Sequence, residues 1–140
     1  MAQGYEFFDH TADIGVHVYG ATLEELFRNA AAALYHVLGE LKRSEVKDEK
    51  PLLIEATSVE DLLHDWLADL LYDVETEHLF YDEFEIHQLT PQRLDATLRG
   101  GEIDFANSQP NEEVKAVTYH HLRVEQLPDN SWRATVILDV

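Results

Sequence analysis

The spacing of apolar residues changes repeatedly along this chain, from a period of three or four residues to a period of two. The longer period gathers apolar side chains on one face of a helix, and the shorter one gathers them on one face of a strand. The helical period occupies residues 20–39 and 58–74. Its apolar members are Leu23, Leu26, Phe27, Ala30, Leu34, Val37 and Leu38, then Val59, Leu62, Leu63, Trp66, Leu67, Leu70, Leu71 and Val74. The chain therefore predicts two amphipathic helices, each with an apolar face that belongs to a core.

Capping residues mark the ends of these helices. Thr22 stands before the first helix with Glu25 three residues later, and Ser58 stands before the second with Asp61 at the matching position. A hydroxyl at the N-cap accepts a hydrogen bond from the main chain three residues on, and an acidic side chain there can return one. Gly39 suits the backbone turn that ends the first helix.

The remaining apolar residues follow the two-residue period of strands. The segments are Leu52–Ala56, Phe84–Ile86, Leu94–Leu98 and Trp132–Leu138. Residues 128–131 are turn formers, so we expect a long terminal hairpin that joins residues 114–126 to residues 132–139. Residues 100–111 read as the one substantial loop. This order predicts an α+β fold, a single domain over residues 1–140 with two amphipathic helices packed on a mostly antiparallel β-sheet.

Composition restricts the classes of function. No cysteine occurs in the 140 residues, which excludes disulfides, thiolate nucleophiles and cysteine-ligated metals. Ten Lys and Arg against 28 Asp and Glu give a formal net charge of −18, which disfavours direct binding of nucleic acid. The sequence shows neither a signal peptide nor the roughly 20 apolar residues that span a bilayer. We expect a cytoplasmic protein with no membrane partner.

A stripe of aspartates follows the polar face of the second helix. Its members, at four-residue spacing, are Asp61, Asp65, Asp69 and Asp73. Like charges at this spacing cost a few tenths of a kcal/mol per pair at low salt. The stripe is either a solvated face or a docking surface for a basic partner, and it is not a metal site.

Acidic groups also lie near both ends of the chain. Asp13 follows the aromatic run at the start, and Asp139 precedes the main-chain carboxylate of Val140 at the end. If folded side by side, these three groups would repel one another, so they would either raise a pKa or hold a cation. Oxygen ligands favour Ca²⁺, Mg²⁺ or Mn²⁺ over zinc or copper. Spacing alone does not bring the two ends together; in the alternative, Asp13 starts a turn and Asp139 is merely terminal.

Two further groups that contain histidine give weaker evidence for a functional site. Asp9, His10 and Asp13 could form an acid–base group, although turn formation by the Asp9 and Thr11 side chains explains the same residues. His120 and His121 are adjacent in a predicted strand, so they should point to opposite faces and cannot chelate one ion. The chain has no phosphate-binding glycine loop and no nucleophile elbow, which disfavours a nucleotide-using enzyme.

Three separated motifs together resemble the archease family. They are D-H-T-A-D-I-G at 9–15, V-K-A-V-T-Y-H at 114–120 and V-I-L-D-V at 136–140. The resemblance runs over nearly the whole chain, and the two predicted helices fall where that family has its helices. One departure is that residues 103–113 contain no histidine, which the family often has before the second motif.

The resemblance implies an accessory protein of RNA ligation that is not itself an enzyme. Archeases act with the RtcB-type RNA ligase, which uses GTP and a divalent metal to guanylylate its own histidine and join RNA ends in tRNA splicing and RNA repair. The accessory protein promotes guanylylation and multiple turnover, and it meets RNA only through the ligase. The family's metal site falls on Asp13, Asp139 and Val140, with Ca²⁺ expected in isolation and Mg²⁺ or Mn²⁺ as alternatives. Competing readings are a chaperone-like interaction module and a small metal-dependent phosphoester hydrolase.

Overall fold

The computed structural model describes residues 4–10, 12–45 and 47–140. In chain order the elements are β1 (Tyr5–His10), β2 (Asp13–Gly20), α1 (Leu23–Leu38), β3 (Gly39–Glu40), β4 (Asp48–Glu55), α2 (Val59–Tyr72), the π-helix η1 (Asp73–Glu77), β5 (Leu79–Thr90), β6 (Arg93–Glu102), β7 (Gln109–Pro110), β8 (Ala116–Val117), β9 (Arg123–Gln126) and β10 (Trp132–Asp139). Both predicted helices are present, and the α+β class is confirmed.

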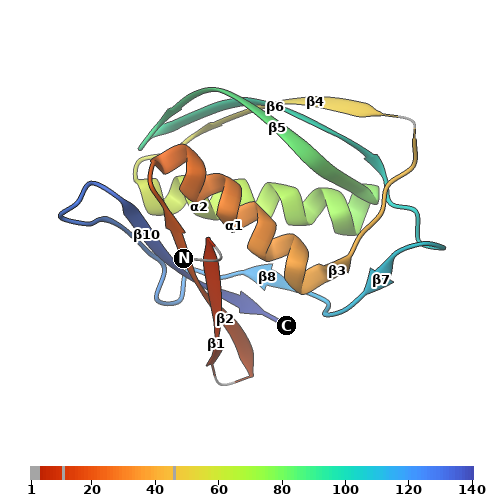
Figure 1. Cartoon of the computed structure of the whole chain (residues 1–140), viewed down its shortest axis with the longest axis horizontal. Helices are drawn as coiled ribbons and strands as arrows, with labels where there is room; N and C mark the ends of the chain where they lie inside the picture. Colours follow the sequence, from red (N-terminus) through yellow and green to blue (C-terminus); the bar gives the residue numbers. More distant parts are fainter. Residues whose placement is uncertain (1–3, 11, 46) are drawn as a thin grey trace.

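The two helices form a middle layer between two antiparallel sheets (Figure 1). On one side lies a three-stranded sheet in the order β4-β6-β5. On the other side lies a five-stranded sheet in the order β1-β2-β10-β8, in which β9 also pairs with β10. A short pair of strands, β3 and β7, joins the end of α1 to the segment after β6. The strands therefore form two main sheets, where the sequence had indicated one.

The width of the apolar surface on α1 explains the second sheet. Its buried residues are Leu26, Phe27, Ala30, Ala31, Ala33, Leu34, Tyr35, Val37 and Leu38. These positions extend well beyond one helix face, so a single sheet would leave part of the surface in water. Trp66 of α2 is fully buried, and its indole N–H donates to the Phe27 carbonyl at 3.0 Å. The helix pair is thus a shared core that both sheets cover.

The predicted caps are present, with one difference. The Thr22 hydroxyl accepts from the Glu25 N–H at 3.1 Å, and the Ser58 hydroxyl accepts from the Asp61 N–H at 3.1 Å. The Glu25 carboxylate accepts from the N–H of Ala21, one residue before the cap. Gly39 ends α1 at φ 137°, a backbone conformation that residues with a Cβ rarely adopt.

The terminal hairpin is interrupted. Strands β8 and β9 pair with the same edge of β10, and residues 119–122 between them leave the sheet. The Tyr119 ring stacks on His64 of α2 with centroids 3.9 Å apart, and the Leu122 N–H donates to the Tyr119 carbonyl to close a turn. His120 and His121 lie in that turn with ring centroids 4.1 Å apart. The expectation that they occupy a strand and point to opposite faces is wrong, because the Tyr119 contact draws the chain off the sheet.

The loop expected over residues 100–111 is also shorter than its composition indicated. Strand β6 continues to Glu102, and Gln109–Pro110 already pairs with β3. The irregular part is therefore confined to residues 103–108, within which Ile103 bridges to Arg43.

The aspartate stripe on α2 is partly neutralised from the neighbouring sheet. Lys50 of β4 places its ammonium nitrogen 2.9 Å from an Asp69 oxygen and 2.8 Å from an Asp73 oxygen. Asp73 is only 4% exposed. The interpretation as a simply solvated face is therefore wrong for this end of the stripe, where one lysine holds two carboxylates between α2 and β4.

Candidate metal centre

Strand pairing brings the two acidic ends of the chain together. Strand β10 runs antiparallel to β2, and Asp139 is the direct cross-strand partner of Asp13. Val140 follows one residue beyond this pair. The juxtaposition depends on the register, since a shift of one residue would turn one of the two side chains to the other face of the sheet.

Both carboxylates lie on the face of the sheet that points away from the helices. Ile14 and Leu138, the next residues along each strand, contact the helix-side core, and alternation sends Asp13 and Asp139 the other way. Directly opposed residues of an antiparallel pair have Cβ atoms about 4.5–5.5 Å apart, and like charges in that position destabilise the sheet. A cation bound between the two carboxylates would offset this repulsion.

An apolar row adjoins the carboxylate pair. The next cross-strand pair on this face is Gly15 and Ile137, and Ile137 is only 1% exposed. The Phe8 ring lies over Gly15 so closely that a Cβ there would be 2.3 Å from it. Phe8 also stacks on His17, with centroids 4.4 Å apart. One side of the carboxylate pair is therefore shielded from water, which strengthens its interaction with any bound cation.

The donor set suits a hard divalent cation but does not complete its coordination. Among the residues that the structure describes, no three His, Asp or Glu side chains converge on one point. Asp13 and Asp139 offer carboxylates, and the main chain at Val140 offers further oxygen, all donors of the kind that Ca²⁺, Mg²⁺ and Mn²⁺ prefer. These cations take six or more oxygen ligands, so water or a partner molecule must supply the others.

The acid–base trio considered from the sequence is divided between the two faces of the sheet. His10 is the register partner of Asp13, and Asp9 is the partner of Ile14, so Asp9 lies on the helix side and Asp13 on the outer side. The His10 side chain and all of Thr11 lie outside the described residues. Asp9 and Asp13 therefore do not act on one substrate atom, and the hydrolase reading loses its geometric basis.

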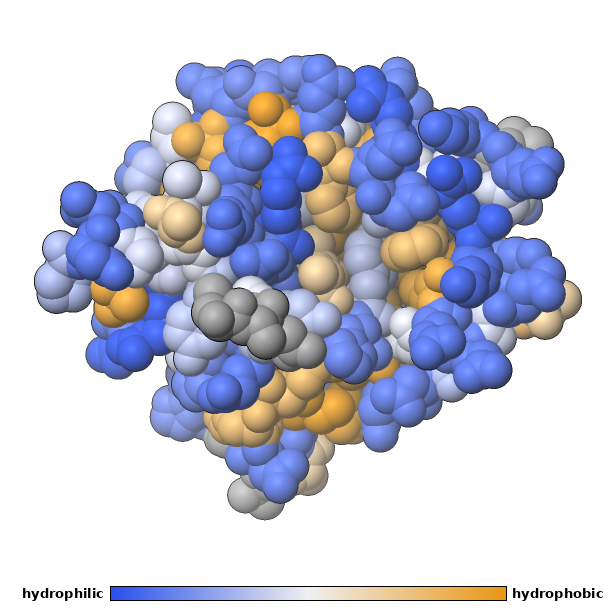
Figure 2. Space-filling view, in the orientation of Figure 1, coloured by the Kyte–Doolittle hydropathy of each residue, from blue (hydrophilic) through white to orange (hydrophobic). Residues whose placement is uncertain are grey.

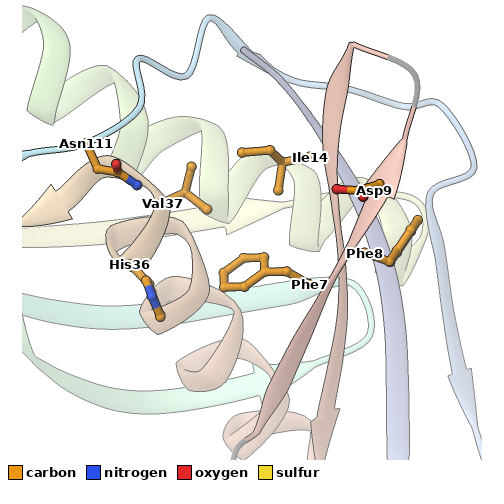
Figure 3. A pocket seen from close by; sticks show the side chains of 7 residues that line it. All are labelled: Phe7, Phe8, Asp9, Ile14, His36, Val37 and Asn111. Atoms are coloured by element: carbon orange, nitrogen blue, oxygen red, sulfur yellow. The ribbon is translucent and has the colours of Figure 1, made fainter.

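Asp9 instead lines a hollow of about 460 Å³ beside β1 (Figure 3). Phe7, Ile14, His36, Val37 and Asn111 are among the other lining residues. The two-residue spacing of Phe7 and Asp9 is the signal that could have placed them on one face of a strand, but no strand was predicted there. Nothing in the sequence placed His36 or Asn111 opposite them, because they arrive from the end of α1 and from the segment after β7.

No helix in the described part of the chain is long and apolar enough to cross a membrane.

Comparison with known proteins extends the resemblance carried by the three motifs. The model of the Archease protein family (MTH1598/TM1083) matches residues 5–140. The chain is 39% identical to "Protein archease" of Pyrococcus furiosus and 36% identical to that of Pyrococcus abyssi, and each match covers 97% of this chain and 98% of the relative.

Solved structures agree with this match. The solution structure of Methanobacterium thermoautotrophicum protein 1598 is 32% identical, with a TM-score of 0.74 over 98% of this chain and 99% of that one. The crystal structure of a Thermotoga maritima archease, described as a "possible chaperone", is 26% identical, with a TM-score of 0.69 over 95% of this chain and 94% of that one.

Proposed function

This chain belongs to the archease family, and on that premise we propose that it is an accessory protein of an RtcB-type RNA ligase. It promotes guanylylation of the ligase with GTP and so allows multiple turnover in tRNA splicing and RNA repair. A divalent cation bound at Asp13, Asp139 and the Val140 carboxylate serves this activity. The protein contacts the ligase directly and RNA only through it.

The observation that carries the proposal is the register that sets Asp139 opposite Asp13. Two acidic side chains directly opposed beside a buried apolar row repel each other, and a cation bound between them would offset that repulsion. A cation there would supply positive charge close to the phosphates of a nucleotide held by the ligase. The incomplete donor set leaves coordination positions for oxygens from outside this chain.

The net charge of −18 supports a protein partner with a basic surface. A ligase that binds RNA must present positive charge around its channel, and opposite charges accelerate encounter and fix orientation. This attraction weakens as ionic strength rises, because the Debye length falls to about 8 Å at physiological salt.

The first test is binding of Mn²⁺ and Ca²⁺ by isothermal titration calorimetry. We expect Asp13→Asn and Asp139→Asn each to weaken binding at least tenfold, whereas Glu55→Gln, on an exposed sheet edge, leaves it unchanged. Extension of the chain by two residues after Val140 should also weaken binding, because it converts the terminal carboxylate into a peptide carbonyl. Equal affinity for all variants would remove this metal site.

The second test is multiple-turnover joining of 3′-phosphate and 5′-hydroxyl RNA by the cognate ligase with GTP and Mn²⁺. Substoichiometric amounts of this protein should accelerate turnover, and Asp139→Asn should lose that effect while it remains folded. Acceleration retained by the variant would separate the accessory activity from the metal site.

The description of the Thermotoga maritima archease as a possible chaperone favours one second candidate, a chaperone-like interaction module. That function would suppress aggregation of unrelated unfolded proteins and would be indifferent to Asp139→Asn. A light-scattering assay with a thermally unfolding client, run beside the ligation assay, separates the two functions.

A further inference from the structure

The hollow that Asp9 lines continues past His36 into a second one. The second has a volume of about 550 Å³ and includes Tyr5, Glu40 and Gln109 in its lining. His36 and Asn111 belong to both. Together they make one groove, called here the β1 groove, between the strand β1 and the carboxyl end of α1.

The wall of the β1 groove opposite β1 is held firmly. The N–H groups of Asn111 and Glu112 donate to the carbonyls of Leu38 and Val37, and Gly39 pairs with Pro110. At the junction of the two hollows, the Tyr5 hydroxyl lies 3.0 Å from His36 Nδ1. The groove is therefore formed before any ligand arrives, which lowers the entropic cost of binding.

The charged side chains that line the β1 groove are acidic. Asp9 and Glu40 are both exposed, and among the described residues no lysine or arginine lines either hollow. Aromatic rings stand between these carboxylates: Phe7 and Tyr5 both meet His36 edge-on, with centroids 5.2 and 5.8 Å away. Carboxylates next to aromatic faces suit a guanidinium or ammonium group, and they repel phosphate.

The strand beside the groove has an unpaired edge. Strand β1 is the outermost strand of its sheet, and no strand of the described chain pairs with its other side. Such an edge presents free N–H and C=O groups to which an extended segment can add as a further strand. Figure 2 shows apolar surface over the β1–β2 hairpin in the lower part of the molecule, where an added strand would gain contact area.

The spacing of side chains on β1 then specifies which residues the added segment needs. Phe7 and Asp9 point to the same face, about 6.6 Å apart, since each strand residue advances about 3.3 Å. Figure 3 shows the Phe7 ring directed toward His36 and Val37, with Phe8 on the other side of the strand. An extended segment paired with the edge of β1 presents every second side chain on this face at the same interval. When a basic residue of that segment lies beside Asp9, the residue two positions away therefore lies beside Phe7.

We infer that the β1 groove binds an extended segment of the protein partner, added as a strand to the edge of β1, with an arginine beside Asp9 and an apolar residue two positions away beside Phe7. The identification of that partner as the RNA ligase rests on the proposed function. The groove itself lies on the helix side of the sheet, opposite the Asp13–Asp139 pair.

The test uses ¹⁵N-labelled protein and a blocked peptide, acetyl-Thr-Arg-Thr-Leu-Thr-amide. We expect shifts of amide signals in β1 and at His36 and Asn111, and at least a fivefold loss of affinity in the Asp9→Asn/Glu40→Gln protein. A peptide with glutamate in place of arginine should not bind, and Glu55→Gln is the matched control. Equal binding of both peptides, or shifts elsewhere, would overturn the inference; so would GTP producing the same shifts in place of the peptide, which would indicate a nucleotide site.

A second arm measures affinity for the cognate ligase. Asp9→Asn/Glu40→Gln should weaken ligase binding at least fivefold while Mn²⁺ affinity is unchanged, because the metal site is on the other face. Unchanged ligase binding would reject the groove as the ligase contact and leave the accessory function intact. If the wild-type protein binds no ligase, the proposed function fails, and the peptide arm still decides the chemistry of the groove.

Discussion

Replacement of Lys50 by methionine tests the contact that joins α2 to the three-stranded sheet. The lysine nitrogen lies within 2.9 Å of both Asp69 and Asp73, and the Asp73 side chain is only 6% exposed. Lys50→Met keeps most of the aliphatic stem and removes the charge, so Asp73 would remain as a buried carboxylate without its cation.

The expected cost follows from these exposures. Loss of one partner of a fully buried pair costs about 3–5 kcal/mol, and an exposed ion pair is worth about 0–1 kcal/mol. Because the Lys50 and Asp69 side chains are 30% and 31% exposed, we expect the free energy of unfolding to fall by about 2–4 kcal/mol. Lys47→Met is the matched control: Lys47 is 59% exposed and 3.6 Å from Glu83, so its loss should cost less than about 0.5 kcal/mol.

Urea unfolding followed by tryptophan fluorescence, to which buried Trp66 and half-buried Trp132 contribute, measures both variants. Addition of Asp73→Asn to Lys50→Met should recover part of the loss, because it removes the unpaired buried charge. Equal stability of Lys50→Met and Lys47→Met would refute the assignment of a stabilising role to this cluster, and so would a double variant less stable than Lys50→Met.

The same cluster predicts a pH dependence. Burial acts to lower the pKa of Lys50, and the hydrogen bonds to Asp69 and Asp73 outweigh it, so the pKa stays above its ordinary value of 10.5. A pKa raised by folding contributes stability that is complete below pH 10.5 and is lost as the pH rises through the folded value. The stability difference between wild type and Lys50→Met should therefore narrow above pH 10.5, and a constant difference would contradict the pairing.

Substitutions also test three local features. Ala12 has φ 59°, a left-handed conformation that costs residues other than glycine about 1–2 kcal/mol. Ala12→Gly should therefore raise the free energy of unfolding by about 0.5 kcal/mol. The control Ala32→Gly, on the exposed face of α1, should lower the free energy of unfolding by about 1 kcal/mol. Gly15→Ala should destabilise the protein, because its Cβ would meet the Phe8 ring at 2.3 Å, and Phe8→Ala in the same chain should relieve the clash; additive losses would contradict this. Trp66→Phe should cost about 2–3 kcal/mol, since it removes the indole hydrogen bond to the Phe27 carbonyl and leaves a cavity in the core; thermal unfolding measures the loss, and a cost below about 0.5 kcal/mol would refute it.

Local interactions made the helices predictable. Thr22 and Ser58 cap the two helices as their spacing to Glu25 and Asp61 indicated, because these hydrogen bonds join residues three apart in the chain. The limits of α1 followed from Thr22 and Gly39. Two-residue periods likewise located β4, β6 and β10, since alternation is a property of each strand alone.

Contacts between segments that are far apart in the sequence were not predicted. The stack of Tyr119 on His64 turned an expected strand into a turn, and Lys50 pairs with two of the four aspartates in the stripe that the sequence assigned to a solvated face or a docking surface. Neither contact joins neighbours in the sequence. Local propensity yields to such contacts because tertiary packing contributes more free energy than the small preferences of single residues.

For the candidate metal centre and the β1 groove, the sequence and the tertiary structure each supply a different part of the description. The sequence by itself indicated the donor chemistry of the proposed site: Asp13 and Asp139 offer carboxylate oxygens in a chain without cysteine, and such oxygens favour a hard cation. The tertiary structure alone decided that Asp139 lies opposite Asp13, and that Asp9, two residues before the turn of the same hairpin, faces His36 and Asn111 on the other side of the sheet. The physical reason is that the chemistry of a side chain depends only on the residue at that position. The register of the strands, and the face of the sheet to which each side chain points, depend on burial of the whole core, to which the strands and both helices contribute.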